Sequence, residues 1–123
     1  HQLAFYDLLP TFLEITSGAS VKSEPKPMVD GISFAPILRG KTRRQEVHDY
    51  LYWEFHETDQ IAVRKGDWKL IVVKGQPRLY NLAEDIHEDN DISAAHPEIV
   101  RELTDIILKE HTPSEFFKVT LPE

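Results

Sequence analysis

The sequence predicts an α+β fold: a small antiparallel β-sheet of three to four strands packed against a long C-terminal helix, with a short N-terminal helix. Two observations predict the sheet and its partner. Strand-like runs between residues 46 and 82 are separated by short glycine-bearing turns, and such connections join neighbouring antiparallel strands. After Pro97, apolar residues recur at helical spacing, as they do in a helix that covers one side of a core.

The chain has 123 residues, which is room for one domain with one core. We expect three segments within this single domain, 1–123. Residues 1–45 hold a helix and connecting loops, 46–82 form the antiparallel meander, and 83–123 hold an acidic loop, the covering helix and a tail. The 28% of charged residues and 41% of hydrophobic residues are typical of a folded globular chain rather than a disordered one.

Charge and composition exclude several classes of function. The net charge is −7, and residues 83–123 contain eleven acidic but only three basic residues. A basic stripe is absent, so we expect no nucleic-acid partner. No apolar run approaches the roughly 20 residues of a membrane helix, so we expect no membrane partner. The absence of cysteine excludes disulfides, thiolate zinc sites and a cysteine nucleophile.

The first segment predicts a helix from Asp7 to about Ile15, with Asp7 as its cap and Gly18 as the left-handed residue after its last turn. Most of its side chains are apolar, so we expect it to be largely buried, against the sheet or against something absent from the chain. Residues 19–29, with Pro25 and Pro27, predict an irregular connection. Because the start at His1 lacks both an initiator Met and a basic segment, we expect a processed chain or a piece of a longer protein.

Period-two alternation predicts the first strand from about Glu46 onwards, since successive side chains of a strand leave opposite faces. The apolar members of this alternation are expected to face the core; they are Val47, Leu51, Trp53 and Phe55. Three further strands are predicted, namely Gln60–Arg64, Trp68–Val73 and Arg78–Leu82.

After the sheet, an acidic and irregular segment leads to the clearest helix signal. Pro97 occupies the favoured first position, and the helix is expected to end before Pro113. Its apolar side is the natural lid for one face of the sheet, and consists of Ile99, Val100, Leu103, Ile106 and Ile107. In the tail, Phe116 and Phe117 are apolar enough to dock.

No self-contained catalytic motif is present. The acidic run from Glu84 to Asp91 lacks the glycine and the final glutamate of an EF-hand loop. No serine lies in a G-x-S-x-G elbow, no glycine-rich phosphate loop occurs, and the histidines are scattered.

One cluster at the end of the first strand has two interpretations. Trp53-Glu54-Phe55-His56-Glu57 places an imidazole and two carboxylates beside aromatic residues, and Arg64 lies near the same end of the hairpin. Either Trp53 and Phe55 belong to the core with solvated polar neighbours, or the cluster contacts a polar ligand such as a sugar. The pattern alone leaves both open.

Several short motifs occur in a fixed order along the chain. They are Asp7-Leu8-Leu9-Pro10-Thr11, Asp30-Gly31-Ile32-Ser33 with Pro36-Ile37-Leu38-Arg39-Gly40, Ala62 to Ile71, Leu79-Tyr80-Asn81-Leu82, and Glu84-Asp85 with Glu88, Asn90 and His96 to Val100. Together they resemble the carboxy-terminal region of the sulfatases related to alkaline phosphatase. The resemblance spans nearly the whole chain. It departs from the family at Ile86, where a proline is usual, and at Ile92, where leucine is commoner.

This resemblance implies that the parent protein is a sulfatase, a sulfuric ester hydrolase such as an arylsulfatase or a glycan sulfatase. Such enzymes use calcium and a formylglycine made from the Cys or Ser of a C/S-x-P-x-R motif, which this sequence lacks. No catalytic or metal-binding residue is therefore mapped onto the chain, which we expect to be inactive alone. By the same likeness, the substrate-binding candidates are Trp53, Glu54, His56, Glu57 and Arg64.

The resemblance also implies partners and a location. The chain is expected to dock against the N-terminal catalytic domain of the same parent, which holds the calcium and formylglycine, and to self-associate when isolated. The substrate would be a sulfated small molecule or glycan, and the parent would be periplasmic or secreted. Two alternatives remain: the same subdomain of a phosphodiesterase or phosphonate hydrolase of the superfamily, and a stand-alone carbohydrate-binding or interaction module.

Overall fold

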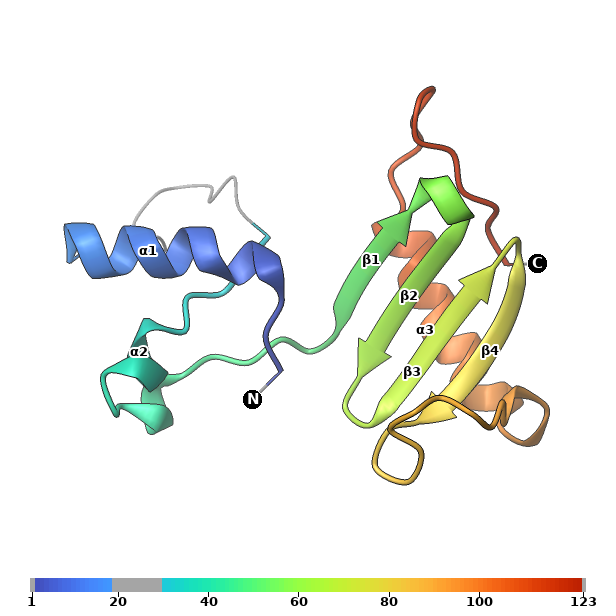
Figure 1. Cartoon of the computed structure of the whole chain (residues 1–123), viewed down its shortest axis with the longest axis horizontal. Helices are drawn as coiled ribbons and strands as arrows, with labels where there is room; N and C mark the ends of the chain where they lie inside the picture. The colour runs from blue at the N-terminus through green and yellow to red at the C-terminus, as the bar shows by residue number, and fades with distance from the viewer. Residues whose placement is uncertain (1, 19–29, 123) are drawn as a thin grey trace. The chain divides into compact units, whose positions relative to one another are not determined.

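The computed structural model describes residues 2–18 and 30–122. They form two compact units, one up to residue 48 and one from residue 49 onwards, and each is described by itself (Figure 1). The elements are those of an α+β fold, as predicted: a four-stranded antiparallel sheet, a long C-terminal helix and a shorter N-terminal helix. The predicted irregular connection at 19–29, with Pro25 and Pro27, lies outside the described residues.

The amino-terminal unit contains α1 (Leu8–Ser17) and α2 (Ala35–Leu38). Single 3-10 turns lie at Phe5–Asp7 and Thr42–Arg44. As predicted, α1 ends where Gly18 adopts the left-handed conformation, with φ of 70°, because glycine has no Cβ to oppose it. The predicted helical turn around Pro36 is also present, as α2.

Asp7 does not cap α1 with its side chain, contrary to the sequence prediction. Its carboxylate is fully buried and instead accepts hydrogen bonds from the backbone N–H of Ala4 at 2.7 Å and of Ile32 at 2.8 Å. The Nε2 of His48 lies 2.8 Å from the same carboxylate. A buried carboxylate needs such partners, so the long-range bonds override the local capping preference.

Gly31 explains why the first two sequence motifs occur together. A Cβ built on Gly31 would lie 2.2 Å from the carbonyl oxygen of Tyr6, far inside van der Waals contact. Only glycine lets the two segments approach this closely.

Within the described residues α1 is not largely buried, so its packing against something absent from the chain stays a prediction. Pro10 and Thr11 are buried, but four large apolar side chains are about half exposed. They are Leu9, Phe12, Leu13 and Ile15. The apolar side chains surround much of the helix, whereas the short α2 packs against only part of it.

The carboxy-terminal unit is built on a sheet of β1 (Leu51–Phe55), β2 (Gln60–Lys65), β3 (Trp68–Val73) and β4 (Gln76–Asn81). The strands lie side by side in chain order, and every neighbouring pair is antiparallel (Figure 1). The first strand begins at Leu51 rather than near Glu46, and the last begins at Gln76 rather than Arg78.

Tight turns set the pairing of β2, β3 and β4. Lys74 and Gly75 both have positive φ, 51° and 79°, as a two-residue type I′ hairpin turn requires. Gly66 has φ of 60° in the β2–β3 turn. The strand after Gly75 therefore starts two residues earlier than predicted, because the turn is only two residues long.

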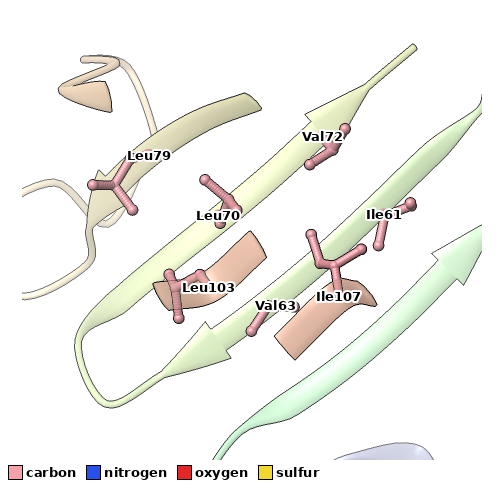
Figure 2. Close-up of a cluster of buried hydrophobic side chains, with 7 residues drawn as sticks. All are labelled: Ile61, Val63, Leu70, Val72, Leu79, Leu103 and Ile107. Atoms are coloured by element: carbon pink, nitrogen blue, oxygen red, sulfur yellow. The ribbon is translucent and has the colours of Figure 1, made fainter. Parts of the chain in front are cut away.

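The helix α3 (Pro97–Glu110) covers one face of the sheet, as predicted. Between them lies a core in which every residue is at most 1% exposed (Figure 2). Its members are Ile61, Val63, Leu70, Val72, Leu79, Leu103 and Ile107. We call this side of the sheet the helix-covered face.

The prediction that Trp53 and Phe55 face the core is wrong. In β1, Tyr52 pairs with Val63 and Glu54 with Ile61, so Tyr52 and Glu54 lie on the helix-covered face. Trp53 and Phe55 therefore lie on the opposite side, the open face, and are 37% and 50% exposed. Val47 precedes the strand and is also exposed. Alternation gives the period of a strand, but not which of its two faces meets the core.

The tail docks through other residues than expected. Phe116 is 84% exposed, and Phe117, although 58% exposed, makes an edge contact with the His56 ring at 4.7 Å. Val119 and Leu121 pack against the core instead. No helix among residues 2–18 and 30–122 is long and apolar enough to cross a membrane.

Candidate functional site

The open face of the sheet contains a hollow of about 460 Å³. Eight sheet residues line it, namely Trp53, Phe55, Gln60, Ile61, Ala62, Arg64, Lys69 and Ile71. The remaining lining residues follow β4 in the chain; they are Leu82, Ile86 and Glu88. Ligand pockets of about 300–1,000 Å³ with apolar walls and a few polar groups are typical of proteins, so the hollow is the candidate site.

The strand register explains its shape. Trp53 pairs with Ala62, and Ala62 with Ile71, so the three side chains form one row across β1, β2 and β3. Side chains in directly paired positions are immediate neighbours on one face. The small alanine between two large side chains leaves a depression at the centre of the row.

The next row of the same face places two cations side by side. Arg64 and Lys69 are direct cross-strand partners, and like charges in that arrangement destabilise a sheet. Lys69 Nζ lies 2.5 Å from the Glu88 carboxylate, while Arg64 Nε donates to the Gly66 carbonyl at 3.3 Å. Within the described part of the chain, no ion pair joins Arg64 to a carboxylate. One of the two positive charges is thus uncompensated.

The loop after β4 is held in place by Asp85. Its carboxylate accepts hydrogen bonds from the backbone N–H of Asn90 at 2.8 Å and of Asp89 at 3.2 Å. These bonds hold the pKa of Asp85 below its usual value, with the Asn90 bond contributing most. Glu88 within this loop has φ of 60°, which is uncommon for a residue with a side chain. The loop thereby presents Ile86 and Glu88 to the hollow.

The structure separates the five residues predicted to contact substrate. Trp53 and Arg64 line the hollow. His56 and Glu57 lie in the exposed 3-10 turn between β1 and β2, and Glu54 lies on the helix-covered face. Lys69, Ile71 and Glu88 were missed. The register that makes Lys69 the neighbour of Arg64 depends on the turn at Gly66, which a sequence pattern places only approximately.

Glu54 belongs to a separate polar cluster where β1 meets the end of α3. Its Oε1 accepts a hydrogen bond from the Tyr52 hydroxyl. The same oxygen lies 2.8 Å from the Nδ1 of His111. Burial, together with the bond to Glu54, raises the pKa of Tyr52 well above its usual value. Nearby, the Tyr50 hydroxyl donates to Glu110 and lowers the pKa of that carboxyl. Each of these groups has a bonding partner within the chain, so we assign them a structural role.

The described residues do not fit a metal or a formylglycine. Across residues 2–18 and 30–122, no three His, Cys, Asp or Glu side chains gather closely enough to hold a metal ion. The buried Asp7 is satisfied by backbone and histidine partners. Because the sequence has no C/S-x-P-x-R motif, no residue of this chain matches the precursor of a formylglycine.

Comparison with known proteins identifies the family. No family model matches the chain. An uncharacterized sulfatase of Schizosaccharomyces pombe is 31% identical over 112 residues, which cover 79% of this chain and 19% of that protein. Solved structures of sulfatases share the fold of this chain. A 2-O GAG sulfatase is 24% identical with a TM-score of 0.61, and a putative sulfatase from Bacteroides thetaiotaomicron is 23% identical with a TM-score of 0.62.

The chain belongs to the sulfatase family. This confirms the resemblance drawn from the ordered motifs. Each of the two structural matches covers 94% of this chain and 30% of the solved sulfatase chain. The chain thus spans about a fifth of the length of the curated relative and under a third of the length of these solved chains.

Proposed function

We propose that the chain is the carboxy-terminal subdomain of a sulfatase that hydrolyses sulfate esters of carbohydrates. Homology to a sulfatase supports the reaction class, and the small share of the relatives' length supports the role as a subdomain. One observation carries the carbohydrate assignment: an exposed indole lies beside two cations in a hollow of ligand size. A 2-O GAG sulfatase among the structures of the same fold supports the same substrate class.

The chemistry at sulfur is assigned to the rest of the parent protein. In this proposal the N-terminal catalytic domain would hold the formylglycine and the calcium, which would supply the nucleophile and the Lewis acid for hydrolysis of the sulfate ester. This chain binds and orients the sugar. Of the predicted contacts, Trp53 and Arg64 are the main ones, His56 and Glu57 lie at the end of the hairpin, and Glu54 acts by holding Tyr52 and His111.

The catalytic domain is also the proposed partner of α1. Leu9, Phe12 and Leu13 are about half exposed on this helix, and exposed apolar groups of this kind mark interaction surfaces. The isolated chain should therefore self-associate through α1. The double substitution Leu9→Ser with Phe12→Ser should shift it towards monomer in sedimentation experiments, whereas Phe116→Ser, at another exposed aromatic, should not.

We also propose that the parent protein is periplasmic or secreted, because sulfated glycans occur mainly outside the cytoplasm. Fractionation of cells that express the parent protein tests the location. Recovery of the parent in the cytoplasmic fraction alone would contradict it.

The function itself is tested by turnover. With calcium present, the isolated 123-residue chain should release no 4-nitrophenol from 4-nitrophenyl sulfate, whereas the parent protein that contains it should release sulfate from sulfated sugars. Turnover by the isolated chain above a protein-free blank contradicts the assignment of catalysis to the rest of the parent protein. A parent that cleaves phosphodiesters or phosphonates but no sulfate ester contradicts the reaction class.

A further inference from the structure

We propose that the carboxy-terminal tail positions the β1–β2 turn, and that Asp59 and Thr120 are the positioning residues that do so. The tail is residues 111–122, which follow α3, and the turn is residues 56–59. The inference rests on the proposed function, because that function assigns His56 and Glu57 of this turn to the substrate. It goes beyond that function by giving a role to a segment that does not line the hollow.

The tail contacts the β1–β2 hairpin at successive points. Its first residue, His111, lies with Nδ1 2.8 Å from the Glu54 carboxylate of β1. Further along, the ring of Phe117 meets the His56 ring edge-on, with centroids 4.7 Å apart. The tail then passes the β1–β2 turn and ends beside the turn between β3 and β4 (Figure 1). The contacts thus advance along the tail and along the hairpin together.

Asp59 joins the turn to two other parts of the carboxy-terminal unit. Its carboxylate accepts hydrogen bonds from the Thr120 backbone N–H at 2.6 Å and from the Thr120 hydroxyl at 2.8 Å. Bonds to an ionised carboxylate are stronger than bonds between neutral groups, and these two hold the pKa of Asp59 below its usual value. The Asp59 carbonyl also accepts from the N–H of Lys74 at 2.9 Å. One residue therefore connects both turns and the tail.

The backbone at Asp59 indicates that its carboxylate is needed there. Asp59 ends the 3-10 turn in the left-handed conformation, with φ of 54°. Glycine adopts this conformation most readily, and aspartate and asparagine tolerate it better than most other residues do. A glycine at this position would fit the turn but would leave both donors of Thr120 without their acceptor.

The tail is itself anchored, so it can hold the turn in place. Val119 and Leu121, on either side of Thr120, pack against the core, and Pro122 is buried. Gly75 gives the tail room, because a Cβ there would lie only 3.0 Å from the Cγ2 of Thr120. Thr120 is therefore fixed between two apolar contacts, where both of its donors reach Asp59.

The turn needs this support because it contributes little of its own. Residues 56–58 are exposed, and a described hydrogen bond within the turn runs from the Asp59 N–H to the His56 carbonyl at 3.1 Å. Exposed turns with few buried contacts are among the least stable parts of a protein. A small displacement of a substrate-positioning group can lower the rate substantially, so the tail should affect how well the turn meets a substrate.

The first arm of the test is hydrogen exchange of the ¹⁵N-labelled 123-residue chain followed by NMR. Asp59→Gly keeps the left-handed turn but removes both bonds to Thr120. We expect the Thr120 amide to exchange about tenfold faster in this variant, or faster still, because its acceptor is gone. Asp59→Asn keeps one acceptor and should lie between the two. Asp67→Asn, in the turn between β2 and β3, is the matched control and should leave this exchange rate unchanged.

The second arm is kinetic and uses the parent protein. Asp59→Gly and Thr120→Val should each raise KM for a sulfated disaccharide about threefold or more, and change kcat/KM for 4-nitrophenyl sulfate by less than about twofold. Thr112→Val, at an exposed threonine of the same tail, should change neither. A tail that only stabilises the fold would instead lower the amount of folded enzyme, and with it the apparent kcat for both substrates at unchanged KM. Circular dichroism checks folding, and if Asp59→Gly does not fold, Asp59→Asn and Thr120→Val decide.

Three results overturn the inference. One is an unchanged exchange rate of the Thr120 amide in Asp59→Gly, which would show that the tail and the turn are held independently. The second is an equal loss of kcat for both substrates at unchanged KM, and the third is no kinetic change for either substrate. If the parent releases no sulfate from either substrate, the proposed function fails instead, and the exchange arm still decides whether the tail holds the turn.

Discussion

The two faces of the sheet contrast sharply although they are made of the same four strands. On the helix-covered face, seven apolar residues that include two from α3 are at most 1% exposed. On the open face, Trp53 and Phe55 remain substantially exposed beside a pair of adjacent cations. Burial against α3 accounts for every member of the first group. It does not account for Trp53 and Phe55, which lie on the opposite face of the sheet.

The largest expected effect separates neighbouring residues of β3. Leu70 is fully buried against α3, whereas Ile71 lines the hollow. Leu70→Ala should lower the free energy of unfolding by about 2–5 kcal/mol, because it leaves a cavity in the core. Ile71→Ala should lower it by less than about 1.5 kcal/mol. Urea denaturation of both variants measures the difference, and equal losses would show that the open face also belongs to a core.

A smaller effect separates neighbouring residues of β1. Glu54→Ala removes the acceptor for the Tyr52 hydroxyl and for His111. Leaving such part-buried groups unpaired should cost about 1–3 kcal/mol. Trp53→Ala should cost less, since its side chain is partly in solvent. If Trp53→Ala is the more destabilising of the two in the same urea assay, the assignment of faces in β1 fails.

The helix-covered face should also respond to alkaline pH. The pKa of Tyr52 is raised in the folded chain by burial and by its bond to Glu54, so the folded state keeps a proton that the unfolded state releases above pH ~10. Stability is therefore fully present below pH ~10 and falls as pH rises beyond it, by up to about 1.4 kcal/mol per pH unit.

Tyr52→Phe is the matched control, because it retains the ring but cannot ionise. Unfolding free energies measured between pH 8 and 11 should fall more steeply in the natural chain than in Tyr52→Phe. Parallel pH profiles would show that Tyr52 ionises freely in the folded state.

The sequence predicted the elements better than their orientation. The Pro97 helix, its apolar stripe and the strand Trp68–Val73 appear as predicted, because their patterns are local. The orientation of β1 was wrong, because Tyr52 and Trp53 both suit a strand and only the pairing with Val63 and Ala62 decides which one meets α3.

The candidate site was only partly predictable for the same reason. Trp53 and Arg64, which the family resemblance named as candidates, both line the hollow. Lys69 becomes their neighbour only through the β2–β3 register, and Glu88 only through the loop that Asp85 fixes. Both depend on turn geometry that one-dimensional spacing leaves undetermined.

The smallest expected effect on stability concerns the ion pair at the hollow. Lys69 and Glu88 are partly exposed, and such pairs contribute about 1 kcal/mol at most. Glu88→Gln should therefore change the unfolding free energy by less than that. In a titration of the chain with inorganic sulfate followed by NMR, however, it frees Lys69 and should increase the affinity; an unchanged affinity would show that Lys69 does not face the anion.

The most direct test of the account compares two substrates of the parent protein. If the open face recognises sugar while chemistry occurs elsewhere, Trp53→Ala should lower kcat/KM at least tenfold for a sulfated disaccharide and less than about twofold for 4-nitrophenyl sulfate, which has no sugar ring; these ratios correspond to about 1.4 and 0.4 kcal/mol of transition-state binding. An equal loss for both substrates, or no loss for either, would contradict the assignment of the open face to sugar recognition.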